Sequence, residues 1–419
     1  MIFEAPNYEQ FGVPVHKFNS IDLALEHLGP DGLYSINIGH ENLPLDLLIN
    51  NFPQENANQL QEIIVAFAGA IPNRVNKTGP FFGFAGVCQQ LRKDVPFIAI
   101  SDPSLYLDKN LNLAWYAGNQ FIPDLIEKIA YLLQGIVQRY KCRLILLGAS
   151  GGGFAALRTL EVIDCSNVSV FTWNPQIKLS KYELWAVRRY ISTCFKVESS
   201  KIKNEKDIEE TLKSLKIKNE TRLVPKKGKI TYFINDDDSS HIFEHMNHYF
   251  LNSDIERINS NNFLTNNCLI HIGSFGKGHA GPTKPVVLET INDTVANKHF
   301  LKYKCIQTRP AKSPLWIDLQ TSVQLEQQQP LHFILNNLLI CSYQPHGYSS
   351  FIATWKIYDD IGNETTTPLN RSQTIAINLE KFDNATTLNC LLEVNGIFNK
   401  KKTYKYKLKL EQIPILPIA

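Results

Sequence analysis

One stretch of the chain organises the rest: Leu146-Leu147-Gly148-Ala149-Ser150-Gly151-Gly152-Gly153. An apolar, strand-like segment precedes it, and an apolar, helix-like segment follows it. Gly-x-Ser-x-Gly in that setting is typical of a nucleophile elbow, a tight strand-to-helix turn that exposes a serine. Glycine is needed on both sides because side chains at Gly148 and Gly152 would collide with the neighbouring strand and helix. The stretch therefore predicts a nucleophile at Ser150.

Short β-rich segments alternate with helical patterns around this turn. Apolar residues at helical spacing predict an amphipathic helix from Ile122 to Tyr140. Several strand-like segments are almost continuously apolar, as expected of parallel strands covered by helices on both faces. The fold class that this alternation predicts is α/β, with a mostly parallel sheet. The predicted strands are residues 62–68, 96–101, 143–147, 168–173, 229–234 and 267–272.

The length of 419 residues predicts more than one domain. Residues 1–58 form either an appendage or extra strands of the sheet, and residues 59–297 form the α/β domain. A lysine- and glutamate-rich insertion around 176–227 separates two core strands and is expected to be a helical cap. Residues 298–419 consist of short β-rich segments broken by Pro, Asn and Gly, which predicts an all-β, sandwich-like module.

Composition and sequence patterns limit the partners and the cellular location that we expect. The formal net charge is only +3, so charge alone implies no nucleic-acid partner. The N-terminus lacks a secretory pattern, and no apolar run is long enough for a transmembrane segment. The eight cysteines contain no C-x-x-C pair, which argues against a zinc ribbon or redox centre. We expect a cytoplasmic protein, with peripheral attachment at the inner face of the membrane as the open alternative.

A serine hydroxyl needs a base, and the base needs an acid that orients it. One predicted strand runs directly into Asp236, Asp237 and Asp238, and the last one leads to a glycine-rich turn that carries His279. Catalytic groups gather at the carboxyl ends of parallel strands, where both segments lie. We expect His279 to be the base and Asp238 the acid, because Asp238 leaves a few residues of turn for its side chain to reach back. Asp236 and Asp237 are weaker candidates.

An oxyanion hole needs two backbone N–H groups where negative charge develops. Gly151, directly after the serine, is expected to provide one. The second is expected from the loop after an early strand, where Gly69 and Ala70 are the alternatives.

Two other interpretations carry less weight. Gly148, Gly151 and Gly153 could cradle a pyrophosphate, but the turn lies mid-chain and the next strand ends without the acidic residue that would hold a ribose. His241, His245 and His248 recur at helical intervals, yet no matched acidic ligands accompany them and surface histidines are common. We therefore expect no metal.

Serine, acid and histidine in this chain order resemble the α/β-hydrolase fold over roughly residues 60–297. Further segments resemble the hydrolase-like proteins of bacterial capsular polysaccharide loci, and the layout is similar to accessory secretion proteins of the O-acetyltransferase type that act on glycan-bearing substrates. The resemblance implies an acyl-ester reaction on a surface glycan or its precursor. The segments that carry it, besides 148–153, are Ile100–Leu105, Leu113–Asn119 and Trp173–Gln176.

Three functions follow as hypotheses. The first is a serine esterase or O-acetyltransferase acting on a glycan or another acylated small molecule. No cofactor is required, and acetyl-CoA is the acyl donor expected of a transferase. The second is a scaffold that binds other polysaccharide-assembly proteins and has a vestigial triad. The third is a general carboxylesterase.

Overall fold

The structure is a computed structural model of the 419-residue chain. No helix that it describes is both long enough and apolar enough to cross a membrane. The described residues are 3–52, 61–91, 95–224, 227–258, 261–265, 267–295, 331–335, 338–342, 352–367, 374–395, 398 and 401–413. The predicted domain boundaries at 58 and 298 fall outside them.

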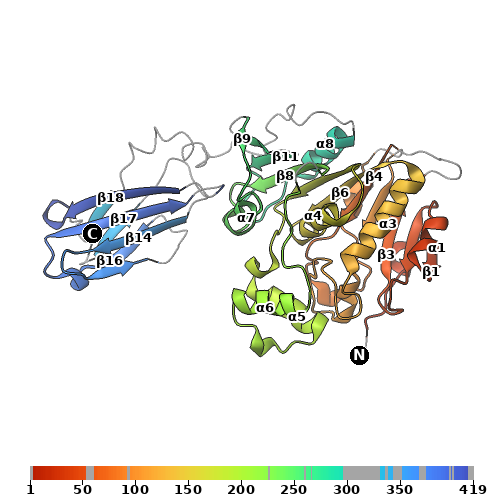
Figure 1. The fold of residues 1–419 in the computed structure, drawn as a ribbon, viewed down its shortest axis with the longest axis horizontal. Coiled ribbons are helices and arrows are strands. Elements are labelled where there is room, and N and C mark those ends of the chain that lie inside the picture. The colour runs from red at the N-terminus through yellow and green to blue at the C-terminus, as the bar shows by residue number, and fades with distance from the viewer. Residues whose placement is uncertain are drawn as a thin grey trace.

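A mixed, mostly parallel sheet of eleven strands forms the centre of the larger part of the molecule (Figure 1). Its order is β1-β2-β3-β5-β4-β6-β7-β8-β11-β10-β9, and the block from β5 to β11 is parallel throughout. The strands are β1 (Val15–Phe18), β2 (Gly32–Ile36), β3 (Leu45–Asn50), β4 (Glu62–Phe67), β5 (Phe97–Ile100), β6 (Arg143–Ala149), β7 (Val168–Trp173), β8 (Lys229–Asn235), β9 (Glu256–Arg257), β10 (Asn262–Thr265) and β11 (Cys268–Gly273).

All six predicted strands are present, each with bounds within two residues of the prediction. The three strands β1, β2 and β3 extend one edge of the sheet, which is the second of the two alternatives for the N-terminal residues.

Both faces of the parallel block are buried. Along β4, Ile63 and Val65 pack into one hydrophobic cluster, while Ile64 and Ala66 pack into another on the opposite face. Because successive side chains of a strand point to opposite faces, this alternation means that other elements must pack on each face of the sheet. Residues of α1, α3 and α4 belong to the first cluster and residues of α2 and α8 to the second. These helices are α1 (Ile21–Glu26), α2 (Ala85–Cys88), α3 (Leu125–Tyr140), α4 (Gly151–Val162) and α8 (Lys284–Val295).

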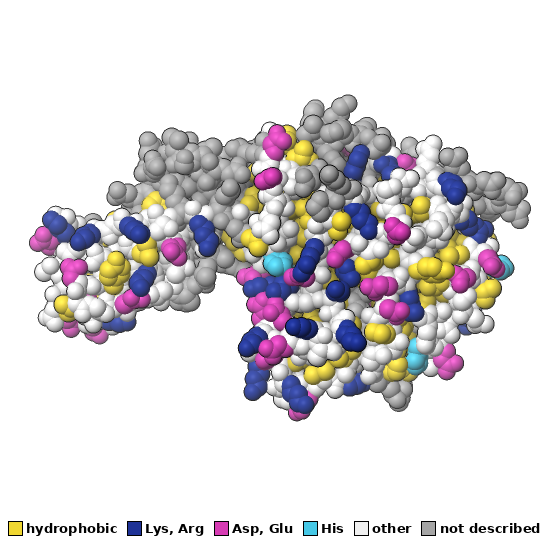
Figure 2. All heavy atoms as spheres, in the orientation of Figure 1, with side chains coloured by type: hydrophobic (Ala, Val, Ile, Leu, Met, Phe, Trp, Pro, Cys, Tyr) yellow, Lys and Arg dark blue, Asp and Glu magenta, His cyan; other side chains and the backbone are white. Residues whose placement is uncertain are grey.

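The predicted insertion contains two helices between β7 and β8, α5 (Leu184–Phe195) and α6 (Glu205–Ser214). Its charges are paired: Lys178 forms an ion pair with Glu209, and Lys181 pairs with Glu205 at 2.9 Å. Figure 2 accordingly shows basic and acidic side chains interspersed over this part of the surface. The region is a solvated helical insertion rather than a basic patch.

The C-terminal part contains two antiparallel sheets, of orders β12-β13-β16 and β15-β14-β17-β18. Alternate residues of β17, namely Leu388, Cys390, Leu392 and Val394, are buried. Such a period of two is expected when one face of a sheet is covered. The strands are β12 (Leu331–Leu335), β13 (Leu338–Ser342), β14 (Ile352–Tyr358), β15 (Glu364–Thr366), β16 (Thr374–Asn378), β17 (Thr387–Asn395) and β18 (Lys401–Lys409).

Candidate active site

Ser150 lies in a strained turn between β6 and α4. Its backbone has φ 53° and ψ −121°, a region that non-glycine residues rarely adopt. A Cβ atom at Gly148 would lie 2.1 Å from the carbonyl oxygen of Gly152, and one at Gly152 would lie 2.3 Å from the carbonyl oxygen of Phe67. Side chains are therefore impossible at both positions without moving backbone. The turn has the geometry that the glycine pattern predicts.

Four neighbouring strands end at the same edge of the sheet. Ser150 follows β6, and the segment 174–176 follows β7, the next strand across. Asp238 follows β8, and His279 lies in the loop after β11. Because these strands are parallel and in consecutive order, the sheet delivers all four segments to one edge.

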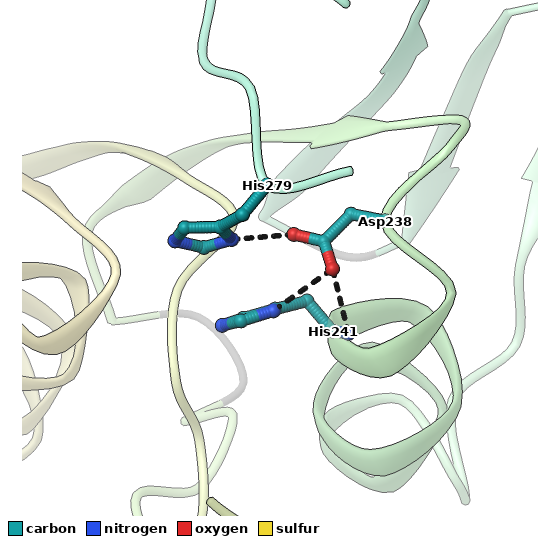
Figure 3. Close-up of side chains that lie close together, drawn as sticks. All are labelled: Asp238, His241 and His279. Carbon is teal, nitrogen blue, oxygen red and sulfur yellow. Dashed lines mark hydrogen bonds and ion pairs between the residues drawn. The ribbon is translucent and has the colours of Figure 1, made fainter. Parts of the chain in front are cut away.

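The carboxylate of Asp238 joins two histidines (Figure 3). Its Oδ2 accepts a hydrogen bond from Nδ1 of His279 at 2.5 Å, and its Oδ1 accepts one from Nδ1 of His241 at 3.0 Å. The backbone N–H of His241 also donates to Oδ1, at 3.2 Å. The two imidazole rings stack with centroids 4.1 Å apart, and their far edges point the same way, away from Asp238. Sequence reasoning predicted the Asp238–His279 pairing but gave His241 no part in it.

The ionisation state of the Asp238 carboxylate depends on its hydrogen-bond partners. The Asp238 side chain is only 5% exposed, and burial by itself would raise its pKa. Hydrogen bonds from His241 and His279 outweigh burial and hold the pKa of Asp238 well below its ordinary value. Burial lowers the pKa of His241, so that ring is neutral at pH 7. His279 is 46% exposed on its side chain and so is open to a substrate.

The other two acids do not contact His279 through any hydrogen bond of the described residues. Asp237 accepts a hydrogen bond from the backbone N–H of Gly278 at 2.8 Å and so fixes the loop before His279. Asp236 is buried, and its backbone N–H donates to the carbonyl of Gly273 at 2.8 Å. Of the three consecutive acids, Asp238 is the one placed to orient the imidazole.

The loop that carries His279 is held by two asparagines. The Asn235 amide donates to the carbonyls of Gly276 and Gly278, at 2.9 and 2.6 Å. The Asn174 amide donates to the carbonyl of Ala280 at 3.0 Å, and its Oδ1 accepts from the backbone N–H of Asn235 at 2.8 Å. Both side chains are buried, so these bonds also satisfy polar groups that water does not reach.

Gln176, two residues after Asn174, holds the serine. Its Nε2 donates to Oγ of Ser150 at 3.1 Å, while its backbone N–H donates to the Ser150 carbonyl at 3.0 Å. Its Oε1 accepts a hydrogen bond from the indole N–H of Trp115. The amide group is thereby fixed with its donor end toward the serine. Sequence reasoning singled out the segment 173–176 only for its resemblance to a family and assigned Gln176 no role.

Trp115 is itself held by a buried turn. Both Trp115 and Tyr116 have left-handed backbones, with φ 56° and 54°. Oδ2 of Asp102 accepts a hydrogen bond from the backbone N–H of Tyr116 at 2.6 Å, which stabilises this turn. The Tyr116 hydroxyl accepts a hydrogen bond from the backbone N–H of Ala68 at 2.9 Å, so this N–H group already has a partner.

Two of the three predicted oxyanion donors, Gly151 and Gly69, lie next to the serine. Gly151 begins α4 directly after it. Gly69 lies close by, since a Cβ atom there would be 3.8 Å from Cβ of Ser150 and 3.0 Å from the carbonyl oxygen of Ala149. Ala70 is exposed and lines an adjacent cavity. Gly69 and Ala70 remain alternatives for the second donor.

The histidines at helical spacing do not form a cluster of three. His241 and His245 are buried, contrary to the expectation of surface histidines, and His248 pairs with Glu220 at 3.1 Å. Within the described part of the chain, the one group with ligand atoms close enough for a metal is Asp238, His241 and His279, with atoms within 4.8 Å of one another. Their Nδ1 and carboxylate atoms bond to each other.

Comparisons with known proteins give structural neighbours only. No protein-family model matches the chain, and no curated protein matches it. Similar solved structures include the capsule O-acetyltransferase of Neisseria meningitidis serogroup A, at 16% identity and a TM-score of 0.40, over 62% of this chain and 96% of that one.

Two other solved structures are also similar to this chain. One is the glycosylation-associated protein complex Gap123 of Streptococcus agalactiae, at 13% identity and a TM-score of 0.39, over 62% of this chain and 46% of that one. The other is an esterase of Thermogutta terrifontis, at 14% identity and a TM-score of 0.36, over 64% of this chain and 94% of that one. The sequence segments resemble hydrolase-like proteins of capsular polysaccharide loci, and a capsule O-acetyltransferase and an esterase are among the structural neighbours.

Asn174→Asp tests whether Asn174 holds the His279 loop. The substitution keeps the acceptor for the backbone N–H of Asn235 but replaces the donor to Ala280 with a carboxylate. One lost hydrogen bond of about 1 kcal/mol predicts roughly fivefold faster amide exchange in residues 274–281. Hydrogen–deuterium exchange with mass spectrometry measures this, with the exposed Asn42→Asp as control. Unchanged exchange in Asn174→Asp would show that the loop is held by other contacts.

Acidification should destabilise the protein through its buried histidines. Burial lowers the pKa values of His241 and His245, so the folded state binds fewer protons than the unfolded state, whose histidines titrate near pH 6.5. Unfolding free energy therefore falls as the pH drops below about 6.5, by up to about 1.4 kcal/mol per pH unit for each such group. Urea unfolding between pH 7.5 and 5 should show a shallower fall for His245→Gln, but not for the exposed His27→Gln. Identical slopes in wild type and His245→Gln would contradict this account.

Proposed function

We propose that this chain is a serine-dependent acyl-transfer enzyme of the α/β-hydrolase type, either an esterase or an O-acetyltransferase. Ser150 is the nucleophile, His279 the general base and Asp238 the acid that orients it. One observation carries the proposal: the 2.5 Å Asp238–His279 hydrogen bond lies at the sheet edge where Ser150 occupies a strained elbow. The buried carboxylate of Asp238 accepts the hydrogen bond from Nδ1–H of His279. Because Nδ1 carries the proton, Nε2 of the same ring is free to accept one.

The reaction then runs in two steps. Nε2 of His279 takes the proton of the Ser150 hydroxyl as Oγ attacks the ester or thioester carbonyl, and the oxyanion receives N–H groups from Gly151 and from Gly69 or Ala70. The C–O or C–S bond breaks, and His279 returns the proton to the leaving group. Water or a sugar hydroxyl next attacks the acyl-serine, with His279 again removing the proton. Ser150 is released with its hydroxyl restored, and the product is a free acid or a new ester.

Gln176 and Asp238 prepare the site before substrate binds. The Gln176 amide fixes the Ser150 hydroxyl oxygen at 3.1 Å, so little reorganisation is needed at the moment of attack. Asp238 stays ionised at neutral pH and therefore stabilises the positive charge that forms on His279. His241 bonds to the second carboxylate oxygen and packs against the His279 ring, which restricts both groups to one orientation.

The substrate class follows from the sequence resemblance. A surface or capsular polysaccharide, or its precursor, would supply or accept the acyl group, and acetyl-CoA would be the donor of a transferase. The named neighbours, a capsule acetyltransferase and an esterase, are of the same two reaction types. A cytoplasmic location and contact with other polysaccharide-assembly proteins are part of the same proposal. The alternative of a non-catalytic scaffold predicts an unreactive serine.

A fluorophosphonate probe separates enzyme from scaffold. Wild type should be labelled covalently on Ser150, because an activated serine attacks the phosphorus, whereas Ser150→Ala should lose all labelling. Ser200→Ala, at an exposed serine far along the chain, is the matched control and should label like wild type. In-gel fluorescence and peptide mapping give the readout. A folded wild type that does not react would overturn the enzymatic proposal.

A second experiment distinguishes hydrolysis from acyl transfer. Release of acetate from p-nitrophenyl acetate, set against transfer of acetyl groups from acetyl-CoA to polysaccharide, measures hydrolysis and transfer with the same protein. Transfer in excess of hydrolysis would assign a transferase, and hydrolysis alone an esterase.

A further inference from the structure

A cavity of about 260 Å³ opens beside the elbow, between the loop after β4 and helix α5. Its floor is apolar and includes Leu111 and Leu113, and its walls include Tyr182 and Trp185. Among the residues that line it, Arg189 carries the one formal charge. The cavity is large enough for a single ring with its substituents rather than for a long chain.

Several residues that line the cavity contact residues of the candidate active site. A Cβ atom at Gly151 would lie 2.5 Å from Cδ1 of Leu113, so the Leu113 side chain covers the residue after the nucleophile. Ala70, a candidate oxyanion donor, lies on its rim. The Tyr182 ring contacts Trp115, with centroids 5.9 Å apart, and Trp115 bonds to the glutamine that holds Ser150. A molecule in the cavity would therefore contact side chains that themselves pack against the candidate active site.

Two residues of α5 determine which chemical groups the cavity could bind. Trp185 and Arg189 are four residues apart in the helix and so lie on the same face, one turn apart. Trp185 is 59% exposed, although a large aromatic side chain is normally buried. Arg189 forms no ion pair with any residue that the structure describes, whereas Lys178 and Lys181 nearby are both paired. An exposed indole beside an unpaired guanidinium is a combination typical of binding surfaces.

We propose that this cavity is a subsite for an acidic pyranose, a sugar ring that bears a carboxylate or phosphate group. The C–H face of the ring packs on the indole of Trp185, and the anionic group pairs with the guanidinium of Arg189, whose planar donors match either anion. This inference rests on the proposed function, since it names the sugar that Ser150 acylates or deacylates. A simple acyl chain would occupy the apolar floor but would give Arg189 no partner.

Binding can be tested without the reaction. In a Ser150→Ala background, isothermal titration would compare a glucuronic acid oligosaccharide with the matched neutral glucose oligosaccharide, and mannose 6-phosphate with mannose. We expect about tenfold tighter binding of at least one anionic sugar than of its neutral partner, and the two pairs distinguish carboxylate from phosphate recognition. Equal affinities within both pairs would overturn the proposal, as would tighter binding of an octanoyl ester than of any sugar.

Substitutions assign the two contacts. Arg189→Gln should abolish the preference for the anionic sugar while leaving affinity for the neutral one unchanged. Trp185→Ala should weaken anionic and neutral sugars by the same factor. Arg222→Gln, at an exposed arginine that pairs with Glu220 outside the cavity, is the matched control and should keep the preference. An Arg189→Gln protein that loses affinity for both sugars alike would contradict the assigned contact.

The two proposals fail in different ways. Because the titrations use Ser150→Ala, they report sugar binding whether or not Ser150 is reactive. An unlabelled wild type with intact anionic preference would refute the acyl-transfer proposal alone. Normal labelling with no anionic preference would refute the subsite alone.

Discussion

The hydrogen bonds of Asp238 are the interaction on which the site depends. A single buried carboxylate accepts hydrogen bonds from two imidazoles that stack on each other, and it stays ionised because those partners outweigh the cost of burial. An unpaired carboxylate in the same place would be protonated or would destabilise the fold. Charge, ring orientation and burial are therefore fixed together, and the far edge of His279 is left exposed.

The rest of the site is built around the segment that follows β7. Asn174 holds the loop of His279, and Gln176 holds Ser150. Two residues apart on one short segment, they connect Ser150 and His279, which are 129 positions apart in the chain. The buried turn at Trp115 completes this arrangement by orienting the Gln176 amide. A shift of this segment would displace both Ser150 and the loop of His279.

Local sequence signals were sufficient for the sheet and for the elbow. Apolar strands with helices between them predict a parallel sheet, because cover on both faces requires continuous apolar residues. Gly148 and Gly152 predict the turn because a side chain at either position would collide with backbone atoms of the same motif or of the adjacent strand. The reach of the side chain after β8 favoured Asp238 over Asp236 and Asp237, and the structure places Asp238 against His279.

Contacts between distant segments could not be predicted in this way. His241 has the same helical spacing as two other histidines, and nothing in that spacing shows that it shares the carboxylate of Asp238. Gln176 and Trp115 belong to separate motifs whose meeting depends on the packed structure. Trp185 and Arg189 lie in an insertion that the sequence predicted only as a helical cap, and their exposure beside a cavity is a property of the fold.

The most direct test of the central claim compares two isosteric substitutions in neighbouring acids. Asp238→Asn removes the charge and leaves a single acceptor oxygen where two histidines each bond to one carboxylate oxygen, whereas Asp237→Asn keeps the one acceptor that the backbone N–H of Gly278 needs. With p-nitrophenyl acetate as substrate and circular dichroism to establish folding, Asp238→Asn should lower kcat about ten-thousandfold, as loss of the orienting acid does in other triads. Asp237→Asn should remain within a few fold of wild type. A folded Asp238→Asn protein with kcat within tenfold of wild type would contradict the account.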